Sequence, residues 1–520
     1  MTKVITADQA AELIKDGDTV AWTTIGMSYF AEEIAQALEK RFVETGSPKG
    51  ITPVHDCGCG DGKDAGMSHL AYPGLVKRLI SGHTGQAPKM GQLIADNQIE
   101  AYLLPQGVLA TLWRQIAGHK PGVITKVGMG TFVDPRISGG KVTDKTTEDL
   151  VKLIDIEDEQ WLLYKSFPVN VAIIRATTAD ENGNLTVEEE AQISEALPMA
   201  QAAHNTGGIV IAQVKYLAEA KSLHPKDVKI PGVLVDYVVV ADPENHKQTI
   251  TTLYNPGLAG NVRVPLGAIP PMPFSERKLI ARRAAMELRP DVLVNLGIGV
   301  PDGVASVAAE EGVVDQFTLT TELGTYGGVP ASGGDFGAAW NADAIIEHHA
   351  QFDFYDGGGL DIAFLGLAQA DAKGNLNVSK FGPRVVGPGG FINITQSAKK
   401  VVFCGTLTAG AKVEFSETGV KVLQEGKAKK FVEAVDHITF SGDIARQNGQ
   451  PVIYITERAV FELRDEGMTL TEIAPGLDLE RDVLAAMDFR PLVADDLREM
   501  PIELFQERWG GLKQIMKAGQ

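Results

Sequence analysis

An internal repeat is the feature of this sequence that most restricts its fold. Residues 171–187 read VAIIRATTADENGNLTV, and residues 362–378 read IAFLGLAQADAKGNLNV. At a constant offset of 191 positions, identical residues align: Ala179, Asp180, Gly183, Asn184, Leu185 and Val187 match Ala370, Asp371, Gly374, Asn375, Leu376 and Val378. The same offset aligns two apolar runs typical of buried strands, residues 210–212 and 401–403. Duplication explains two matches at one offset better than chance does, so we expect two halves with similar folds.

Each half alternates short apolar runs with segments of helical period. This pattern is typical of α/β domains whose sheets are largely parallel. A looser repeat links residues 18–22 with residues 291–295, where an apolar strand leads toward a glycine and then a helix. The expected helices include residues 30–42, 108–117 and 276–288, and a mostly buried strand is expected over residues 233–240.

Prolines concentrate between the two halves. Asn255-Pro-Gly257 is followed by four further prolines, at 265, 270, 271 and 273. Proline is excluded from helix interiors and central strands, and a chain of 520 residues exceeds the size of one growing core. The sequence therefore predicts a first domain over residues 1–254, an extended, semi-rigid linker over residues 255–275 and a second domain over residues 276–520.

Composition excludes several classes of function. The net charge of -19 argues against a nucleic-acid surface, which requires a basic patch. No run of about 18 apolar residues is present, so no membrane span is expected. Three cysteines and no long apolar N-terminal segment favour a reducing, cytoplasmic location. Cys57 and Cys59 lack a second Cys/His pair at zinc-finger spacing, and no metal site is expected.

One carboxylate, Glu322, lies beside a glycine-rich turn in the segment TELGTYGGVP, residues 321–330. The segment follows a strand-like run over residues 317–320, so little side-chain bulk would separate the carboxylate from a substrate. A carboxylate ionised near neutral pH is a nucleophile that needs no general base. The alternative is an acidic turn residue without a chemical role.

Two glycine segments could bind an anion. In NLGIGVP, residues 295–301, the glycines lie between an expected strand and an expected helix, where backbone N–H groups can bind a phosphate or a thioester oxygen. In GPGGF, residues 387–391, successive amides can form a nest for an oxyanion. The alternatives are a tight βα turn and a loop corner. The ten histidines form no catalytic or zinc-binding pattern, and no G-x-S-x-G elbow is present.

Together these segments resemble the family I coenzyme A transferases, in the branch of short-chain acyl-CoA:acetate and propionate CoA-transferases. The resemblance runs nearly end to end. It is carried by LPQGV, KVGMGTFVDPR, NLGIGVP, TELGTYGG, FDFYDGGG, GPGGF and ITERAVF, which begin at residues 104, 126, 295, 321, 352, 387 and 455. Two motifs depart from the family: TELG stands for the commoner SENG, and residues 24–30 only partly match the amino-terminal G-G-F-x-x-x-G-x-P signature.

The resemblance implies a role for nine residues. Glu322 matches the glutamate that becomes a covalent glutamyl–CoA thioester, and Gln106 matches a glutamine that reaches this carboxylate. The remaining matches are Gly389 and Gly390 as oxyanion donors, within a loop that includes Gly387 and Phe391, and Asn295, Gly297 and Gly299 at the CoA and acyl site. Coenzyme A is then substrate and covalent intermediate, with no permanently bound cofactor, and a homo-oligomer is expected.

The resemblance thus implies an enzyme that transfers CoA from a short-chain acyl-CoA to acetate, propionate or a similar carboxylate, with ping-pong kinetics. A 3-oxoacid CoA-transferase and a CoA-ester hydrolase are close alternatives. A sugar-phosphate isomerase on a related scaffold would need phosphate-binding cations, for which Lys380 and Arg384 are the nearest candidates. A non-catalytic ligand-binding protein is the last alternative. The sequence does not rank the carboxylates.

Overall fold

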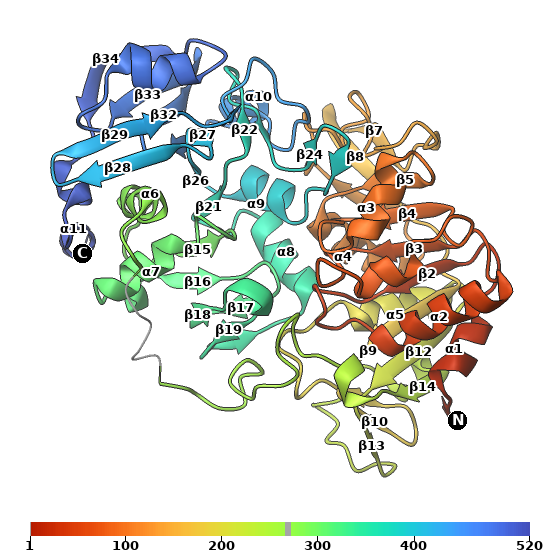
Figure 1. Cartoon of the computed structure of the whole chain (residues 1–520). Helices are drawn as coiled ribbons and strands as arrows, with labels where there is room; N and C mark the ends of the chain where they lie inside the picture. Colours follow the sequence, from red (N-terminus) through yellow and green to blue (C-terminus); the bar gives the residue numbers. More distant parts are fainter. Residues whose placement is uncertain (1, 266–271, 520) are drawn as a thin grey trace.

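The computed structural model describes residues 2–265 and 272–519, and it shows two halves that are each built on a large sheet (Figure 1). In the first sheet every pair of neighbouring strands is parallel. Its strands are, in spatial order, β1 (Lys3–Val4), β14 (Tyr237–Val240), β12 (Ile209–Val214), β9 (Val171–Arg175), β2 (Thr19–Trp22), β3 (Thr52–His55), β4 (Arg78–Ser81) and β5 (Glu100–Leu103).

The second sheet has a parallel centre with antiparallel pairs toward both edges. Its strands are, in spatial order, β20 (Ala344–Ile345), β17 (Thr325–Tyr326), β16 (Thr318–Thr320), β15 (Leu293–Leu296), β21 (Ile362–Gly366), β26 (Val401–Cys404), β31 (Val452–Ile455), β32 (Ala459–Arg464), β33 (Gly467–Ile473) and β34 (Leu492–Glu499). The expected α/β fold with largely parallel sheets is confirmed.

The repeated segments form the same local structure twice. A short hairpin, β10 (Thr178–Asp180) with β11 (Leu185–Thr186), recurs as β22 (Gln369–Ala370) with β23 (Leu376–Asn377), and the paired residues are related by the same offset. In both hairpins an aspartate closes the turn, since Asp180 and Asp371 each accept hydrogen bonds from the backbone N–H of the residues two and four positions later. Both turns place a glycine at a φ of 81°. These matches support duplication as the origin of the two halves.

Helices cover the sheets and join the halves. They are α1 (Ala7–Leu13), α2 (Glu32–Thr45), α3 (Pro88–Ala95), α4 (Gln106–Ala117), α5 (Ala196–Asn205), α6 (Glu276–Ala285), α7 (Gly303–Glu310), α8 (His348–Asp356), α9 (Phe391–Ser397), α10 (Gly442–Gln447) and α11 (Gly511–Ala518). The expected helices correspond to α2, α4 and α6, with ends shifted by up to three residues. Among the described helices, none is long and apolar enough to cross a membrane.

Two expectations about connecting segments need correction. The strand expected over residues 233–240 is only β14 (Tyr237–Val240), because Val233 lies on the surface with 84% of its area exposed. The linker was expected to be extended, but Leu258 is buried against Ala331 and Ala338 of the second half. Residues 266–271 of that linker lie outside the described residues. We keep the domain boundary at residues 255–275 as a proposal.

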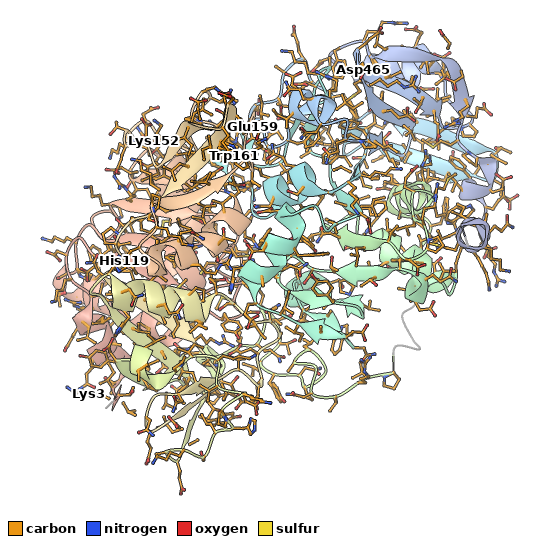
Figure 2. All side chains as sticks on the ribbon, turned by 180° about the vertical axis from the view of Figure 1, so that it is seen from behind. Lys3, His119, Lys152, Glu159, Trp161 and Asp465 are labelled. Carbon is orange, nitrogen blue, oxygen red and sulfur yellow. The ribbon has the colours of Figure 1, made fainter. Side chains whose placement is uncertain are left out.

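The halves meet along α4 and α8 (Figure 1). A Cβ atom at Gly107 on α4 would lie 2.3 Å from the ring of Phe352 on α8, so only glycine permits this approach. The first half also has a small sheet, β6 (Gly122–Thr125), β8 (Glu159–Lys165) and β7 (Val151–Ile156). Figure 2 labels Trp161 on this sheet and Asp465 at the far end of the second half, on the turn between β32 and β33.

Candidate active site

Glu322 lies just beyond the carboxyl end of β16, in a turn that leads into β17. The turn is closed by a hydrogen bond from Gly324 N–H to the carbonyl oxygen of Thr321 (3.1 Å). Gly324 has a φ of 99°, and a Cβ atom there would lie 2.1 Å from the carbonyl oxygen of Ile346. A glycine is therefore required at position 324, two residues after Glu322, which explains the E-x-G spacing.

Strand pairing shows which residue of the first half corresponds to Glu322. Val20 lies opposite Pro53 in the first sheet, and Val294 lies opposite Leu319 in the second. Val20 and Val294 also lie opposite residues that are related by the repeat offset. The two strands β3 and β16 are thus equivalent, and three residues beyond these positions lie two carboxylates, Asp56 and Glu322.

A cavity opens on one side of Glu322. It is lined by backbone of the glycine segment after β15, by the turn containing Glu322 and by a loop of small and apolar residues: Asn295, Leu296, Gly297, Ile298, Asp302, Ala305, Thr321, Glu322, Leu323, Pro330, Ala331, Ser332, Gly333, Phe336 and Gly337. The structure therefore brings parts of two expected segments, residues 295–301 and 321–328, to one cavity.

The glycine turn before α9 lies on the other side of Glu322. A Cβ atom at Gly390 would lie 3.2 Å from the carboxylate carbon of Glu322, so the turn and the carboxylate are in contact distance. Among the described residues, the N–H of Gly390 has no backbone or side-chain acceptor. The N–H of Gly389 instead donates to the carbonyl oxygen of Gly82 (2.9 Å). The expectation that both amides serve as oxyanion donors is corrected, because only that of Gly390 is available.

The other expected site residues occupy different positions. Asn295 is buried and donates its side-chain amide to the Tyr355 hydroxyl (3.2 Å). Gly297 lines the cavity, and Gly299 lies on the exposed loop that follows, with a φ of 91°. Phe391 was expected to contact substrate, but its ring is buried and stacks on Phe403 in the core.

Gly387 brings the two halves together. A Cβ atom there would lie 2.6 Å from the carbonyl oxygen of Gly82, so a side chain would force the halves apart. Gln106, at the first position of α4, is also at this junction, since its backbone N–H donates to the carbonyl oxygen of Gly389 (3.0 Å). A Cβ atom at Gly389 would lie 3.5 Å from Gln106 Oε1. The side chains of Gln106 and Glu322 thus both approach the glycine turn at residues 389–390.

A buried cluster behind Gln106 was missed by sequence reasoning. His348 Nε2 lies 2.9 Å from Gln106 Nε2, and His348 Nδ1 lies 2.9 Å from Glu195 Oε2 and 3.5 Å from Asp56 Oδ2. The Asp56, Glu195 and His348 side chains have no exposed area. These residues are far apart in the chain, so no spacing rule could have united them, and only the equivalence of Asp56 with Glu322 hinted at a role.

The surroundings of Glu322 change its acidity. Burial raises the pKa of Glu322 to about 7, and the nearby charge of His348 limits this rise. A carboxylate without a salt-bridge partner at the edge of a cavity is poorly solvated, which makes it a stronger nucleophile once ionised. Burial thus moves the ionisation of Glu322 up toward neutral pH, whereas the sequence predicts a carboxylate that is already ionised there.

The chain is similar to known proteins over nearly its whole length. Residues 4–241 match the family model described as Coenzyme A transferase. A caffeate CoA-transferase of Acetobacterium woodii is 52% identical over 99% of this chain and 100% of the relative. The chain belongs to the coenzyme A transferase family. An acetate CoA-transferase of this family, YdiF of Escherichia coli K12, is 44% identical over 96% of this chain and 95% of its own length.

Solved structures of the coenzyme A transferase YdiF from Escherichia coli O157:H7 have the same fold. The apoenzyme is 43% identical, covers 98% of this chain and 97% of its own, and superposes with a TM-score of 0.93. A second structure of YdiF, described as a thioester complex with CoA, superposes with a TM-score of 0.92 over the same shares of both chains. The protein is an enzyme that transfers CoA, and CoA is its substrate.

Proposed function

We propose that the enzyme transfers CoA between an acyl-CoA and a free carboxylate through a covalent thioester on Glu322. The observation that carries this proposal is the position of Glu322 between the cavity and the Gly390 amide. The YdiF structure described as a thioester complex with CoA supports it, because that relative has the same fold.

In the first half-reaction, a carboxylate oxygen of Glu322 attacks the thioester carbon of the acyl-CoA. The carbon–sulfur bond breaks, a CoA thiolate leaves, and a mixed anhydride forms between the acyl group and Glu322. The thiolate then attacks the glutamyl carbonyl carbon, the first carboxylate leaves, and the enzyme becomes a glutamyl–CoA thioester. A second carboxylate runs the same steps in reverse, so charge balances without a general acid.

Each addition passes through a tetrahedral oxyanion, and hydrogen-bond donors must lie ready for it. The N–H of Gly390 is the donor that we propose, because Gly390 lies against the Glu322 carboxylate and its N–H has no acceptor among the described residues. Loss of one such donor typically costs about 10²–10³ in kcat. Water must also be excluded, because both the anhydride and the thioester would otherwise hydrolyse. Ile25, Cys57 and Leu323 form an apolar cluster between the halves beside this turn, and it would shield the glutamyl thioester.

Acetate and propionate are the proposed acceptors, and the acetate CoA-transferase YdiF supports the first of them. A hydroxycinnamate is a second candidate, supported by the more similar relative named caffeate CoA-transferase. A 3-oxoacid remains an alternative, whereas family membership gives no support to a sugar-phosphate isomerase or a non-catalytic binding protein. We also propose that the enzyme is cytoplasmic and that it forms a homo-oligomer. Light scattering would test the oligomeric state.

Initial rates over a matrix of acyl-CoA donors and carboxylate acceptors test this proposal. The acceptors should include acetate, propionate, acetoacetate and caffeate. A covalent enzyme intermediate predicts parallel lines in double-reciprocal plots, because the first product leaves before the second substrate binds. Intersecting lines would refute the covalent route. Consumption of acyl-CoA at the same rate without any carboxylate would identify a hydrolase instead.

A further inference from the structure

The buried cluster of Asp56, Glu195 and His348 contains two carboxylates that have no role in the mechanism proposed above. Among the described residues, both oxygens of Asp56 and one oxygen of Glu195 have no hydrogen-bond donor. A buried carboxylate without a partner is costly unless a nearby positive charge compensates it. Among the charged and titratable groups that act on His348, namely Asp56, Glu195, Glu322 and His349, none is an arginine or lysine. The compensating charge must therefore be the imidazolium of His348.

The contact between His348 and Gln106 has two possible arrangements of hydrogens. Two nitrogens at 2.9 Å cannot both donate. A neutral His348 with its proton on Nδ1 would accept from the Gln106 NH₂ group, which would turn the amide oxygen toward Gly389. An imidazolium would donate Nε2–H, so the amide must rotate by half a turn and present its oxygen to His348. Rotation exchanges O and N at nearly the same positions, and the protonation of His348 decides between them.

We propose that His348 is a positioning residue that, held as an imidazolium by Asp56 and Glu195, fixes the amide of Gln106 with its NH₂ group toward the reaction centre. This inference rests on the proposed function, because an NH₂ donor beside Glu322 matters only for an oxyanion formed there. The amide of Gln106 and the N–H of Gly390 then provide two donors from two halves of the molecule. Asp56, at the position equivalent to Glu322, then stabilises the positive charge of His348.

The acidities of these groups agree with the geometry. Burial alone lowers the pKa of His348, but the contacts with Asp56 and Glu195 outweigh it and raise the pKa to about 10. Burial and the charge of Asp56 raise the pKa of Glu195 to about 8. Both shifts favour a proton on Glu195 beside the charged ring of His348. The ligand atoms of Asp56, Glu195 and His348 also lie close enough together to hold a metal ion, which is the competing occupant of the cluster.

Protonation can be observed without any assay. Nitrogen spectra of the full chain labelled with ¹⁵N-histidine, recorded by magic-angle spinning NMR, resolve imidazolium from neutral rings. The signals absent from His348→Gln belong to His348, and both of its nitrogens should carry protons from pH 6 to about pH 9. A neutral ring at pH 7 would overturn the proposal, as would a stoichiometric metal ion at this cluster in elemental analysis.

A set of variants tests the action through Gln106. His348→Asn retains a donor near the Nδ1 position but loses the reach to Gln106, whereas His348→Gln retains a donor near the Nε2 position. We expect His348→Asn to lower kcat about 100-fold with KM for the acyl-CoA nearly unchanged, because an oxyanion donor is lost. His348→Gln should recover part of this loss. The control His349→Asn alters the neighbouring, half-buried histidine and should leave kcat unchanged.

A double-mutant cycle completes the test. Once Gln106→Leu has removed the amide, His348→Asn should cost nothing further in kcat if His348 acts only through Gln106. If the wild-type enzyme transfers CoA and the losses of the two single variants add in the double variant, the role of His348 is refuted. The proposed function is then left intact. If the wild-type enzyme forms no thioester on Glu322, the proposed function fails, and the NMR experiment still decides the charge of His348. Thermal melting of each variant identifies any that does not fold.

Discussion

The two halves of this coenzyme A transferase place a carboxylate at the same strand end and use it differently. Asp56, after β3, has no exposed side-chain area and lies against Glu195 and His348. Glu322, after β16, is longer by one methylene, has no salt-bridge partner among the described residues and lines a cavity. Duplication thus supplied two equivalent acids, and their surroundings determine which one can react.

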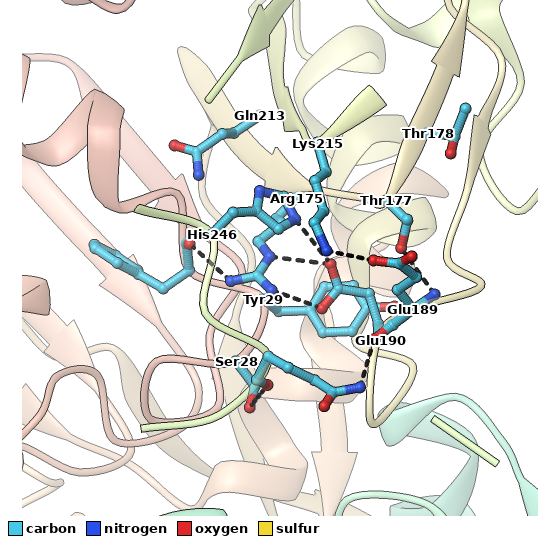
Figure 3. A network of polar contacts seen from close by, with 12 residues as sticks. Ser28, Tyr29, Arg175, Thr177, Thr178, Glu189, Glu190, Gln213, Lys215 and His246 are labelled. Carbon is cyan, nitrogen blue, oxygen red and sulfur yellow. Dashed lines mark hydrogen bonds and ion pairs between the residues drawn. The ribbon is translucent and has the colours of Figure 1, made fainter. Parts of the chain in front are cut away.

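A second pair of equivalent positions also differs between the halves. Arg175 ends β9 and Gly366 ends β21, and the repeat offset relates them. The guanidinium of Arg175 is buried and forms two hydrogen bonds with Glu190, as Figure 3 shows. It also donates to the carbonyl oxygen of Met27. A Cβ atom at Gly366 would meet no atom within 4 Å. A buried polar network thus surrounds the end of β9, whereas the end of β21 carries a glycine with open space beside it.

The largest expected effect separates the two acids. Glu322→Gln removes the nucleophile and should lower kcat by about 10⁴ or more. Asp56→Asn weakens only the hold on His348 and should lower kcat by about 10². Steady-state rates of CoA transfer measure both. A larger loss in Asp56→Asn would show that the two strand ends have been assigned the wrong way round, and equal losses would contradict their different uses.

The next effect concerns the glycine turn beside Glu322. In Gly390→Ala the added Cβ would lie 3.2 Å from the carboxylate carbon and 3.3 Å from atoms of Ile394 and Phe352. The displaced carboxylate should cost about 100-fold in kcat, since misplacement by about 1 Å has that effect. Gly91→Ala, on α3 with no atom near the new methyl group, is the matched control. Unchanged transfer by Gly390→Ala would remove this turn from the site.

Acidity gives a smaller and graded effect. Because burial raises the pKa of Glu322 to about 7, the rate of enzyme acylation by acyl-CoA should rise with pH through about 7 and then level off. The raised pKa favours the protonated folded state, so its contribution to stability is complete below pH 4.5 and is lost as pH rises through 7. Single-turnover rates between pH 5 and pH 9 measure the first effect. A profile flat down to pH 5 would contradict this acidity.

The smallest effect on chemistry is expected from the Arg175–Glu190 network of the first half. Burial raises the pKa of Glu190, but Arg175 outweighs it and lowers the pKa to about 2. Arg175→Met leaves this carboxylate buried without its partner and should cost about 3–5 kcal/mol of the free energy of unfolding. The kcat of the folded fraction should not change. Lys40→Met, which breaks an exposed ion pair with Asp8, is the control and should not alter stability measurably. A loss of kcat in Arg175→Met would mean that the network serves the site directly.

The repeat, with its alternation of apolar runs and helical segments, was enough to predict the fold. It succeeded because strand pairing and the Asp180 and Asp371 turns depend on local residues that both copies retain. The segments around Glu322 and Asn295 were recognised for the same reason, since each is a short stretch with glycines at defined positions.

The rest of the site depends on contacts between segments that are distant in the chain. The amide of Gly389 is occupied by Gly82, and the ring of Phe391 packs on Phe403, neither of which a motif reveals. No sequence pattern indicates a role for His348, because its partners, Glu195 and Gln106, lie on other elements and follow no period. Sequence patterns therefore located the proposed nucleophile, Glu322, but not the residues that hold its surroundings.

The most direct test of the assignment is chemical trapping of the enzyme thioester. The enzyme is incubated with acetyl-CoA and treated with borohydride, which reduces a glutamyl thioester to a primary alcohol, and its peptides are analysed by mass spectrometry. The modification should appear on the peptide containing Glu322, depend on acetyl-CoA and be absent in Glu322→Gln. Modification of the peptide containing Asp56, or of no acidic residue while CoA transfer proceeds, would contradict the assignment of the nucleophile to the second half.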